Sequence, residues 1–187
     1  MYKNNVRILI LESHKDTAIS YKNILEKRTH TVTLVDNSED CLKLYSEELQ
    51  NIRISGISQT KNPFDIVMLD FVTSKTNYID LIKEILAINP HQRILFLFSA
   101  DVRRTLVNSA RQLKQVVELI QKPFDIQSLV DIVEDKYIHE ELEKFKINVA
   151  VFQKEADMTV IEFPKVKDSK IGELKQNIIT SFKKAEK

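Results

Sequence analysis

The stretch that decides the fold is FDIVMLDF, residues 64–71. It is a nearly continuous apolar run that ends in a carboxylate, Asp70. A run of this kind is typical of a strand that is buried on both faces of a parallel sheet. Asp70 is then either a working residue at the carboxyl end of the strand or the start of an ordinary polar loop. The rest of the sequence has to separate these two interpretations.

Strands and helical patterns alternate along the chain. Besides 64–69, the apolar runs with the length of a strand are residues 6–11, 31–35, 93–98 and 116–120. Helical periodicity lies between and after them, at residues 16–28, 38–49, 78–89, 103–114 and 125–145. In the first of these helices, the buried face is predicted to hold Ala18, Ile19, Ile24 and Leu25. The alternation predicts an α/β fold with a parallel sheet and right-handed crossovers.

Polar residues follow four of the five predicted strands: Glu12, Asp70, Ser99 and Lys122. In open α/β sheets, ligands bind outside the carboxyl ends of the strands. The shared placement of these four residues is therefore the first sign of a functional site.

The last forty or so residues differ from the rest of the chain. Residues 147–152 and 158–163 predict a β-hairpin, and residues 169–187 predict an amphipathic helix. A segment of this length is short for a core of its own, so we expect it to pack on the main domain or on a partner chain. The sequence thus divides into a main domain, 1–137, and an extension, 138–187, made of a helix continuation, the hairpin and the terminal helix.

Composition excludes several classes of protein. The 187 residues include 28 basic and 27 acidic residues, and this balance predicts neither a nucleic-acid partner nor a membrane partner. No apolar stretch is long enough to span a bilayer. The single cysteine, Cys41, cannot form an intramolecular disulfide and is expected on a buried helix face. These features predict a cytoplasmic protein.

The common enzyme signatures are also missing. The only glycines are Gly56 and Gly172, which excludes phosphate-binding glycine-rich loops. The motifs CxxC, HExxH and GxSxG do not occur, and the four histidines lack metal-ligand spacing. No enzymatic activity is predicted.

The strand-end motifs resemble those of the response-regulator receiver domain, the phosphoacceptor module of two-component signalling. They are ILILES (8–13), DIVMLD (65–70), LFLFSA (95–100) and LIQKPFD (119–125), in the receiver order and with similar spacing. The resemblance covers roughly the first 135 residues. It implies a flavodoxin-like sheet of five parallel strands in the order 2-1-3-4-5, with helices on both faces and with the C-terminal segment as a small α+β extension.

The resemblance also implies a chemistry. Asp70 would be the phosphoacceptor, and Lys122 and Ser99 would contact the phosphoryl group. A Mg²⁺ ion would be held by Glu12, Asp70 and the backbone carbonyl of Val72. The implied partners are a histidine kinase or phosphotransfer protein, a downstream protein target and a second copy of the chain in a homodimer. The tail is too short for the winged-helix DNA-binding effector of many response regulators.

Among the positions that depart from the receiver pattern, three bear on the choice of function. Ser13 stands where a second acid normally supplies a metal ligand, Tyr78 where glycine is usual, and Leu119 where an aromatic switch residue is expected. Two hypotheses follow. The chain is a phosphorylatable receiver, as Asp70 and its implied partners favour. Alternatively, it is a pseudo-receiver, a phosphorylation-independent interaction or dimerisation module, as the three departures favour.

Replacing Ser13→Asp is expected to strengthen Mg²⁺ binding, because it restores an anionic oxygen ligand at the position where receivers carry one. A direct Mg²⁺ titration of the variant and the original chain measures the effect. An unchanged affinity would place Ser13 away from the metal.

Overall fold

A computed structural model of the chain describes residues 5–56, 61–71, 78–113, 115–155 and 158–163. The chain forms two compact units, residues 1–97 and 98–187. The predicted terminal helix at 169–187 lies outside the described residues. The boundary predicted between a main domain and an extension, at residue 137, stays a prediction.

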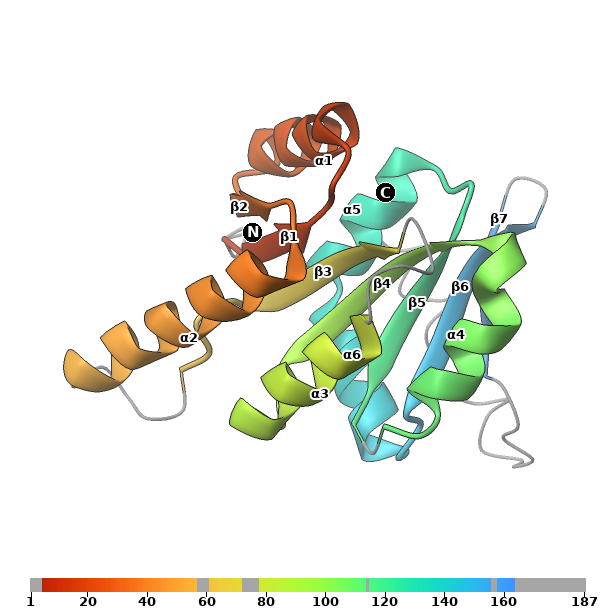
Figure 1. Ribbon diagram of the computed structural model, residues 1–187. Helices are drawn as coiled ribbons and strands as arrows, with labels where there is room; N and C mark the ends of the chain where they lie inside the picture. Colours follow the sequence, from red (N-terminus) through yellow and green to blue (C-terminus); the bar gives the residue numbers. More distant parts are fainter. Residues whose placement is uncertain (1–4, 57–60, 72–77, 114, 156–157, 164–187) are drawn as a thin grey trace. The chain divides into compact units, whose positions relative to one another are not determined.

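The strands form one sheet in the order β2-β1-β3-β4-β5-β6-β7 (Figure 1). Their bounds are β1 Arg7–Leu11, β2 Thr31–Val35, β3 Ile66–Phe71, β4 Arg93–Ser99, β5 Val117–Lys122, β6 Val149–Glu155 and β7 Met158–Glu162. The order of the first five strands is the predicted 2-1-3-4-5, so the flavodoxin-like α/β fold is confirmed. The predicted hairpin is confirmed as the antiparallel pair β6 and β7. The sequence did not indicate that β6 also pairs with β5, in parallel.

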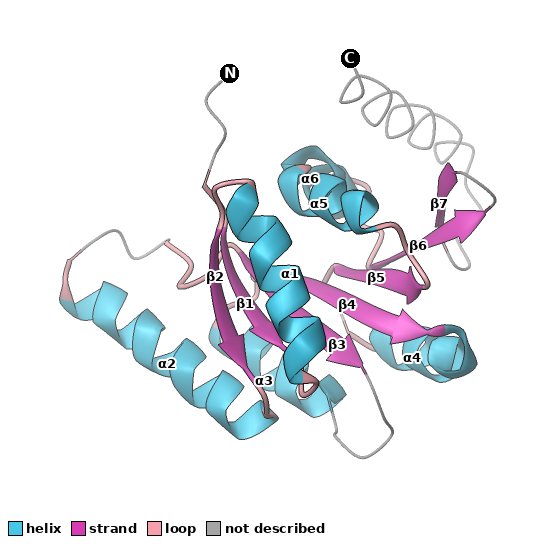
Figure 2. Ribbon diagram, turned by 90° about the horizontal axis from the view of Figure 1, so that it is seen from above, coloured by secondary structure: helices cyan, strands magenta, loops and turns pink. Residues whose placement is uncertain are grey.

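In the first unit, β1 lies between β2 and β3 and runs parallel to both. Helix α1 (Lys15–Lys27) lies on one face of these strands, and α2 (Ser38–Ile54) and α3 (Tyr78–Ile88) lie on the other (Figure 2). Because both faces are covered, the inner strands have no water-facing side. This explains why their sequences are continuous apolar runs rather than alternating ones.

The core of the first unit is built on β1 and β3. The completely or almost completely buried residues there are Ile8, Leu9, Ile10, Leu11, Ile66, Val67, Met68 and Leu69. Cys41 is buried on α2, as predicted. The predicted buried face of α1 is partly wrong: Ala18, Tyr21 and Leu25 are buried, whereas Ile19 is 40% exposed. The spacing of three and four residues puts Tyr21 on the same face as Ala18 and Leu25.

In the second unit, a short 3₁₀ turn, η1 (Ala100–Val102), leads into α4 (Arg103–Ala110). Helix α4 lies on one face of β5 and β6, and α5 (Ile126–Glu134) and α6 (Lys136–Lys144) lie on the other (Figure 2). The single helix predicted for 125–145 is wrong, because Asp135 interrupts it with an extended backbone. The Asp135 carboxylate accepts a hydrogen bond from the Ile138 backbone N–H at 3.2 Å and so starts α6.

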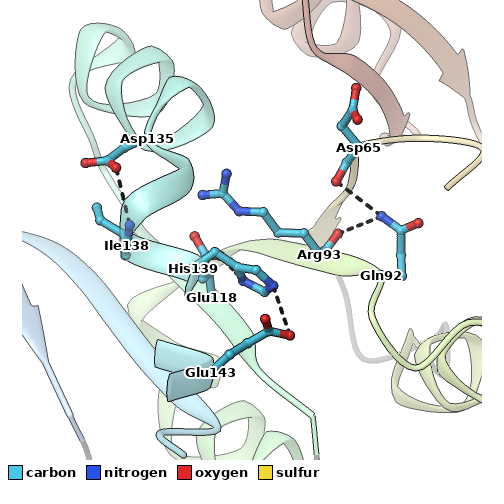
Figure 3. Close-up of polar contacts among 8 residues, drawn as sticks. All are labelled: Asp65, Gln92, Arg93, Glu118, Asp135, Ile138, His139 and Glu143. Atoms are coloured by element: carbon cyan, nitrogen blue, oxygen red, sulfur yellow. Dashed lines mark hydrogen bonds and ion pairs between the residues drawn. The ribbon is translucent and has the colours of Figure 1, made fainter. Parts of the chain in front are cut away.

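Several polar groups in the core of each unit have partners (Figure 3). In the second unit, Glu118 is completely buried on β5, and its Oε1 lies 2.8 Å from Nδ1 of His139 on α6. In the first unit, the side-chain amide of Gln92 donates to the backbone oxygens of Arg93 at 3.1 Å and Asp65 at 3.4 Å. These contacts keep the desolvation cost of polar groups in the core low.

None of the helices in the described part of the chain has both the length and the apolar character that a membrane span needs.

Val151 of β6 is fully buried and pairs in register with Leu119 of β5. Val151→Ala should lower the free energy of unfolding by about 2 kcal/mol, because it removes buried methyl groups and leaves a cavity. Urea denaturation measures the change. Ile54→Ala is the control, because Ile54 is 77% exposed on α2 and its truncation should have little effect. Equal stability of the two variants would mean that β6 is not part of the core.

Candidate functional site

Two carboxylates meet at the carboxyl ends of β1 and β3. The two strands are paired with Leu11 opposite Leu69, so Glu12 and Asp70 occupy the next position of the register. Asp70 is completely buried and Glu12 is 2% exposed. Strand β3 ends later than its apolar run, residues 64–69, indicated, because it continues through Asp70 to Phe71. The sequence correctly predicted that these two side chains lie at the same edge of the sheet.

Of the two side-chain oxygens of Glu12, one has hydrogen-bond partners among the described residues and the other does not. Its Oε1 accepts a hydrogen bond from the backbone N–H of His14 at 2.7 Å and lies 3.2 Å from the His14 ring nitrogen Nδ1. Its Oε2 is buried and has no hydrogen-bond partner among the described residues. Burial and, after it, the neighbouring Asp70 carboxylate raise the pKa of Glu12 from 4.5 to about 7, against the opposing effect of the His14 hydrogen bonds.

Tyr21 is the site residue that the sequence analysis missed. Its hydroxyl donates a buried hydrogen bond of 2.9 Å to Oδ2 of Asp70, 49 residues away in the chain. Burial and the Asp70 charge raise the pKa of the Tyr21 hydroxyl well above its usual range, so it stays a donor. The available signal was its spacing from Ala18 and Leu25, which places Tyr21 on the buried face of α1.

The structure also shows where the positions that differ from the receiver pattern lie. Ser13 is exposed, directly after Glu12. Tyr78 begins α3 and is 6% exposed, with its ring centroid 5.2 Å from that of Phe71. Tyr78, at the position where receivers have glycine, therefore forms an aromatic pair with the residue that follows Asp70 in the chain. Val72, the predicted donor of a backbone carbonyl ligand, lies outside the described residues.

Ser99 and Lys122 belong to the second unit, where they are the last residues of β4 and β5. Both are partly exposed. The Ser99 side chain makes no capping hydrogen bond to the turn that follows it. Leu119 is completely buried within β5. The approach of Ser99 and Lys122 to Asp70 stays a prediction of the sequence.

The carboxylate pair fits a divalent cation. Mg²⁺ prefers hard oxygen ligands and commonly keeps several waters while one or two carboxylates bind it. When Glu12 is ionised, its Oε2 has no hydrogen-bond partner among the described residues, and close to the Asp70 carboxylate it is an oxygen that a cation would satisfy. Within the described ranges, no three His, Cys, Asp or Glu side chains form a metal-binding group. The residues that could hold a Mg²⁺ ion here are Glu12 and Asp70, and Ser13 offers no third carboxylate.

Glu12 and Ser13 also line a groove of about 700 Å³ in the first unit. The groove is bordered by α1, β2 and α2, with Ile19 and Leu44 among its apolar residues and Lys15 and Lys43 among its charged ones. Glu12 lies at the edge of this groove, but its side chain is completely buried.

No protein-family model matches the chain. A search of curated proteins finds no match either. Solved structures do resemble it. A response regulator receiver domain protein from Clostridium thermocellum is 19% identical, with 74% of this chain and 98% of that chain covered and a TM-score of 0.57.

Two further structures are similar to this chain. The chemotaxis protein CheY4 from Vibrio cholerae is 13% identical, with 70% of this chain and 98% of that chain covered and a TM-score of 0.54. A protein described as adenylate cyclase from Rhodopirellula baltica is 16% identical, with 76% and 98% covered and a TM-score of 0.55. The chain thus has the fold of receiver domains, and its function has to be argued from its site.

The raised pKa of Glu12 predicts a pH-dependent stability. Between about pH 4.5 and pH 7 the folded chain holds a proton on Glu12 that the unfolded chain has lost, so stability falls as the pH rises through this window. Above the window the loss amounts to about 3 kcal/mol. Glu12→Gln stays neutral, so it should be the more stable protein at about pH 8 and similar to the original chain near pH 4.5.

Urea denaturation across this pH range, in buffer without divalent cations, measures the difference. Glu47→Gln is the control, because Glu47 is exposed on α2. If Glu12→Gln and Glu47→Gln show the same pH dependence, Glu12 is ionised in the folded chain throughout the range.

Proposed function

We propose that this chain is the receiver module of a phosphorelay, which accepts a phosphoryl group on Asp70 and signals through protein–protein contact. The observation that carries the proposal is the buried pair of Glu12 and Asp70, at the carboxyl ends of adjacent parallel strands in a chain with the receiver fold. A buried carboxyl group with a raised pKa, such as Glu12, is typical of functional sites at such a position.

In the proposed reaction, a lone pair of an Asp70 carboxylate oxygen attacks the phosphorus of a phosphohistidine. The nitrogen–phosphorus bond breaks, and the imidazole nitrogen keeps that electron pair. The carboxylate is a competent nucleophile when the negative charge of the phosphoryl oxygens is neutralised. Lys122 supplies a cation and Ser99 a hydroxyl donor. Mg²⁺ held by Glu12 and Asp70 would supply further positive charge.

The proposed partners follow from this role. A histidine kinase or a phosphotransfer protein delivers the phosphoryl group, and a downstream protein target or a second copy of the chain reads the result. The chain itself then needs no further catalytic activity and acts in the cytoplasm. Nucleic acid is not part of the proposal, because the chain carries a formal net charge of only +1.

A second function is favoured by one specific observation. Ser13 is exposed and supplies no carboxylate where receivers have a metal ligand. A pseudo-receiver would keep the fold as a constitutive interaction or dimerisation module and would not transfer phosphate. The two functions differ in whether Asp70 reacts.

Amide NMR of the full chain tests this difference. Mg²⁺ is titrated first, and then beryllofluoride, which mimics a phosphoryl group on an aspartate. We expect shifts at Asp70, Ser99 and Lys122, because the mimic contacts the carboxylate, the hydroxyl and the ammonium together. Asp70→Asn is the control and should show none of the beryllofluoride shifts.

A spectrum that does not respond to beryllofluoride would contradict phosphoacceptance and favour the pseudo-receiver. Shifts that persist in Asp70→Asn would also contradict it, because the mimic would then bind elsewhere.

A further inference from the structure

Tyr21 and Asp70 form a side-chain pair inside the first unit. The tyrosine is 6% exposed and the aspartate is completely buried. The hydroxyl of Tyr21 donates to Oδ2 of Asp70 at 2.9 Å, a normal length for a hydrogen bond from a hydroxyl group. The bond therefore links α1 directly to the candidate phosphoacceptor.

The packing of α1 does not by itself require this hydroxyl. A phenylalanine would fill nearly the same volume against the sheet, without a polar group to satisfy. The same unit contains a second buried tyrosine, Tyr45 of α2, whose hydroxyl donates to Oε1 of Gln92 at 2.9 Å. The two tyrosines are thus alike in burial and bond length. They differ in their partners: Tyr21 donates to a carboxylate, whereas Tyr45 donates to a neutral amide and also accepts a hydrogen bond of 3.2 Å from the Asn89 side-chain amide.

A hydrogen bond to a carboxylate is stronger than one to a neutral carbonyl group. When Asp70 carries a phosphoryl group, one of its oxygens is bonded to phosphorus and the other is a carbonyl oxygen with little charge. If Oδ1 is the oxygen that reacts, the acceptor of Tyr21 loses its charge. If Oδ2 reacts, the oxygen that accepts the hydrogen bond from Tyr21 becomes bonded to phosphorus, and it is then a weaker acceptor. In either case the bond from Tyr21 is weaker after the reaction than before it.

We propose that Tyr21 is a positioning residue that restrains Asp70: its hydroxyl stabilises the unmodified carboxylate more than either the phosphorylated or the cation-bound form. The phosphorylation half of this inference rests on the proposed function of Asp70. The cation half does not, because Mg²⁺ and the Tyr21 hydroxyl compete for the same carboxylate whether or not phosphate is ever transferred.

Tyr21→Phe removes the hydroxyl and keeps the ring. The hydrogen bond from Tyr21 is stronger to a charged carboxylate than to a neutral oxygen. The difference in free energy corresponds to a change of about fivefold in an equilibrium constant. The variant is therefore expected to bind Mg²⁺ about fivefold more tightly, and to reach a correspondingly higher ratio of phosphorylated to unmodified chain.

The experiment compares the full-length chain with Tyr21→Phe and with the matched control Tyr45→Phe. Mg²⁺ affinity is measured by calorimetric titration. Phosphorylation is measured by intact mass after incubation with acetyl phosphate. In that reaction an Asp70 oxygen bonds to phosphorus while the phosphorus–oxygen bond to the acetyl group breaks and acetate leaves with the electron pair. Thermal unfolding of all three proteins shows whether both substitutions leave the fold intact.

Tighter Mg²⁺ binding and more phosphorylation in Tyr21→Phe, with Tyr45→Phe like the original chain, would support the inference. Phosphorylation of Asp70 in every protein, with Tyr21→Phe no different from Tyr45→Phe, would overturn it while leaving the proposed function intact. Tighter Mg²⁺ binding in Tyr21→Phe with no phosphorylation of any protein would support the restraint and overturn the proposed function. Weaker Mg²⁺ binding in Tyr21→Phe, or neither Mg²⁺ binding nor phosphorylation in any protein, would overturn the inference.

Discussion

The pairing of β1 with β3 is the constraint on which the candidate site depends. Leu11 lies opposite Leu69, and this register brings Glu12 and Asp70 to the same edge of the sheet. A shift by one residue would turn the side chains of one strand to the opposite face. Such a shift would force the closely packed side chains of Ile8, Leu9, Val67 and Met68 into spaces shaped for other residues. It would also break the 2.7 Å hydrogen bond from the Arg7 backbone N–H to the Asp65 carboxylate. The core thus fixes the geometry of the carboxylates.

The polar groups around this pair act in different ways on the two acids. Asp70 accepts a hydrogen bond from Tyr21, which lies on the buried face of α1. Glu12 accepts its bonds from His14, which is exposed and lies in the connection before the same helix. One carboxylate is therefore held by the core and the other by a segment at the surface. This asymmetry suits a site in which one acid stays in place while the other responds to a bound ion.

How far the sequence predicts this structure depends on the kind of signal. The continuous apolar runs give the strands, their parallel order and the shared edge of Glu12 and Asp70, because burial on both faces leaves a strong pattern. Tyr21 was missed because the apolar residues of α1 allow two faces, and only the packed structure shows that Ile19 is exposed. The break at Asp135 was missed because the helical periodicity continues on both sides of it. The pairing of β6 with β5 was missed because register between distant strands leaves no local signal.

The stability of the two units does not require buried acids, and this bears on the choice between the proposed functions. An interaction module could keep the same fold with an apolar residue in place of Glu12 or Asp70, and a buried carboxylate pair costs stability unless both members are satisfied. The Tyr21 hydroxyl offsets part of that cost at Asp70. At Glu12 a buried oxygen has no partner among the described residues, and the pKa of the group is raised accordingly. The desolvation cost that remains uncompensated in this pair is therefore that of Glu12. Glu12 lies beside the candidate phosphoacceptor Asp70, and a cation bound there would lower this cost. A purely structural role gives no reason for that arrangement, whereas the proposed phosphoryl transfer to Asp70 would use a cation at that place to neutralise the charge of the phosphoryl oxygens.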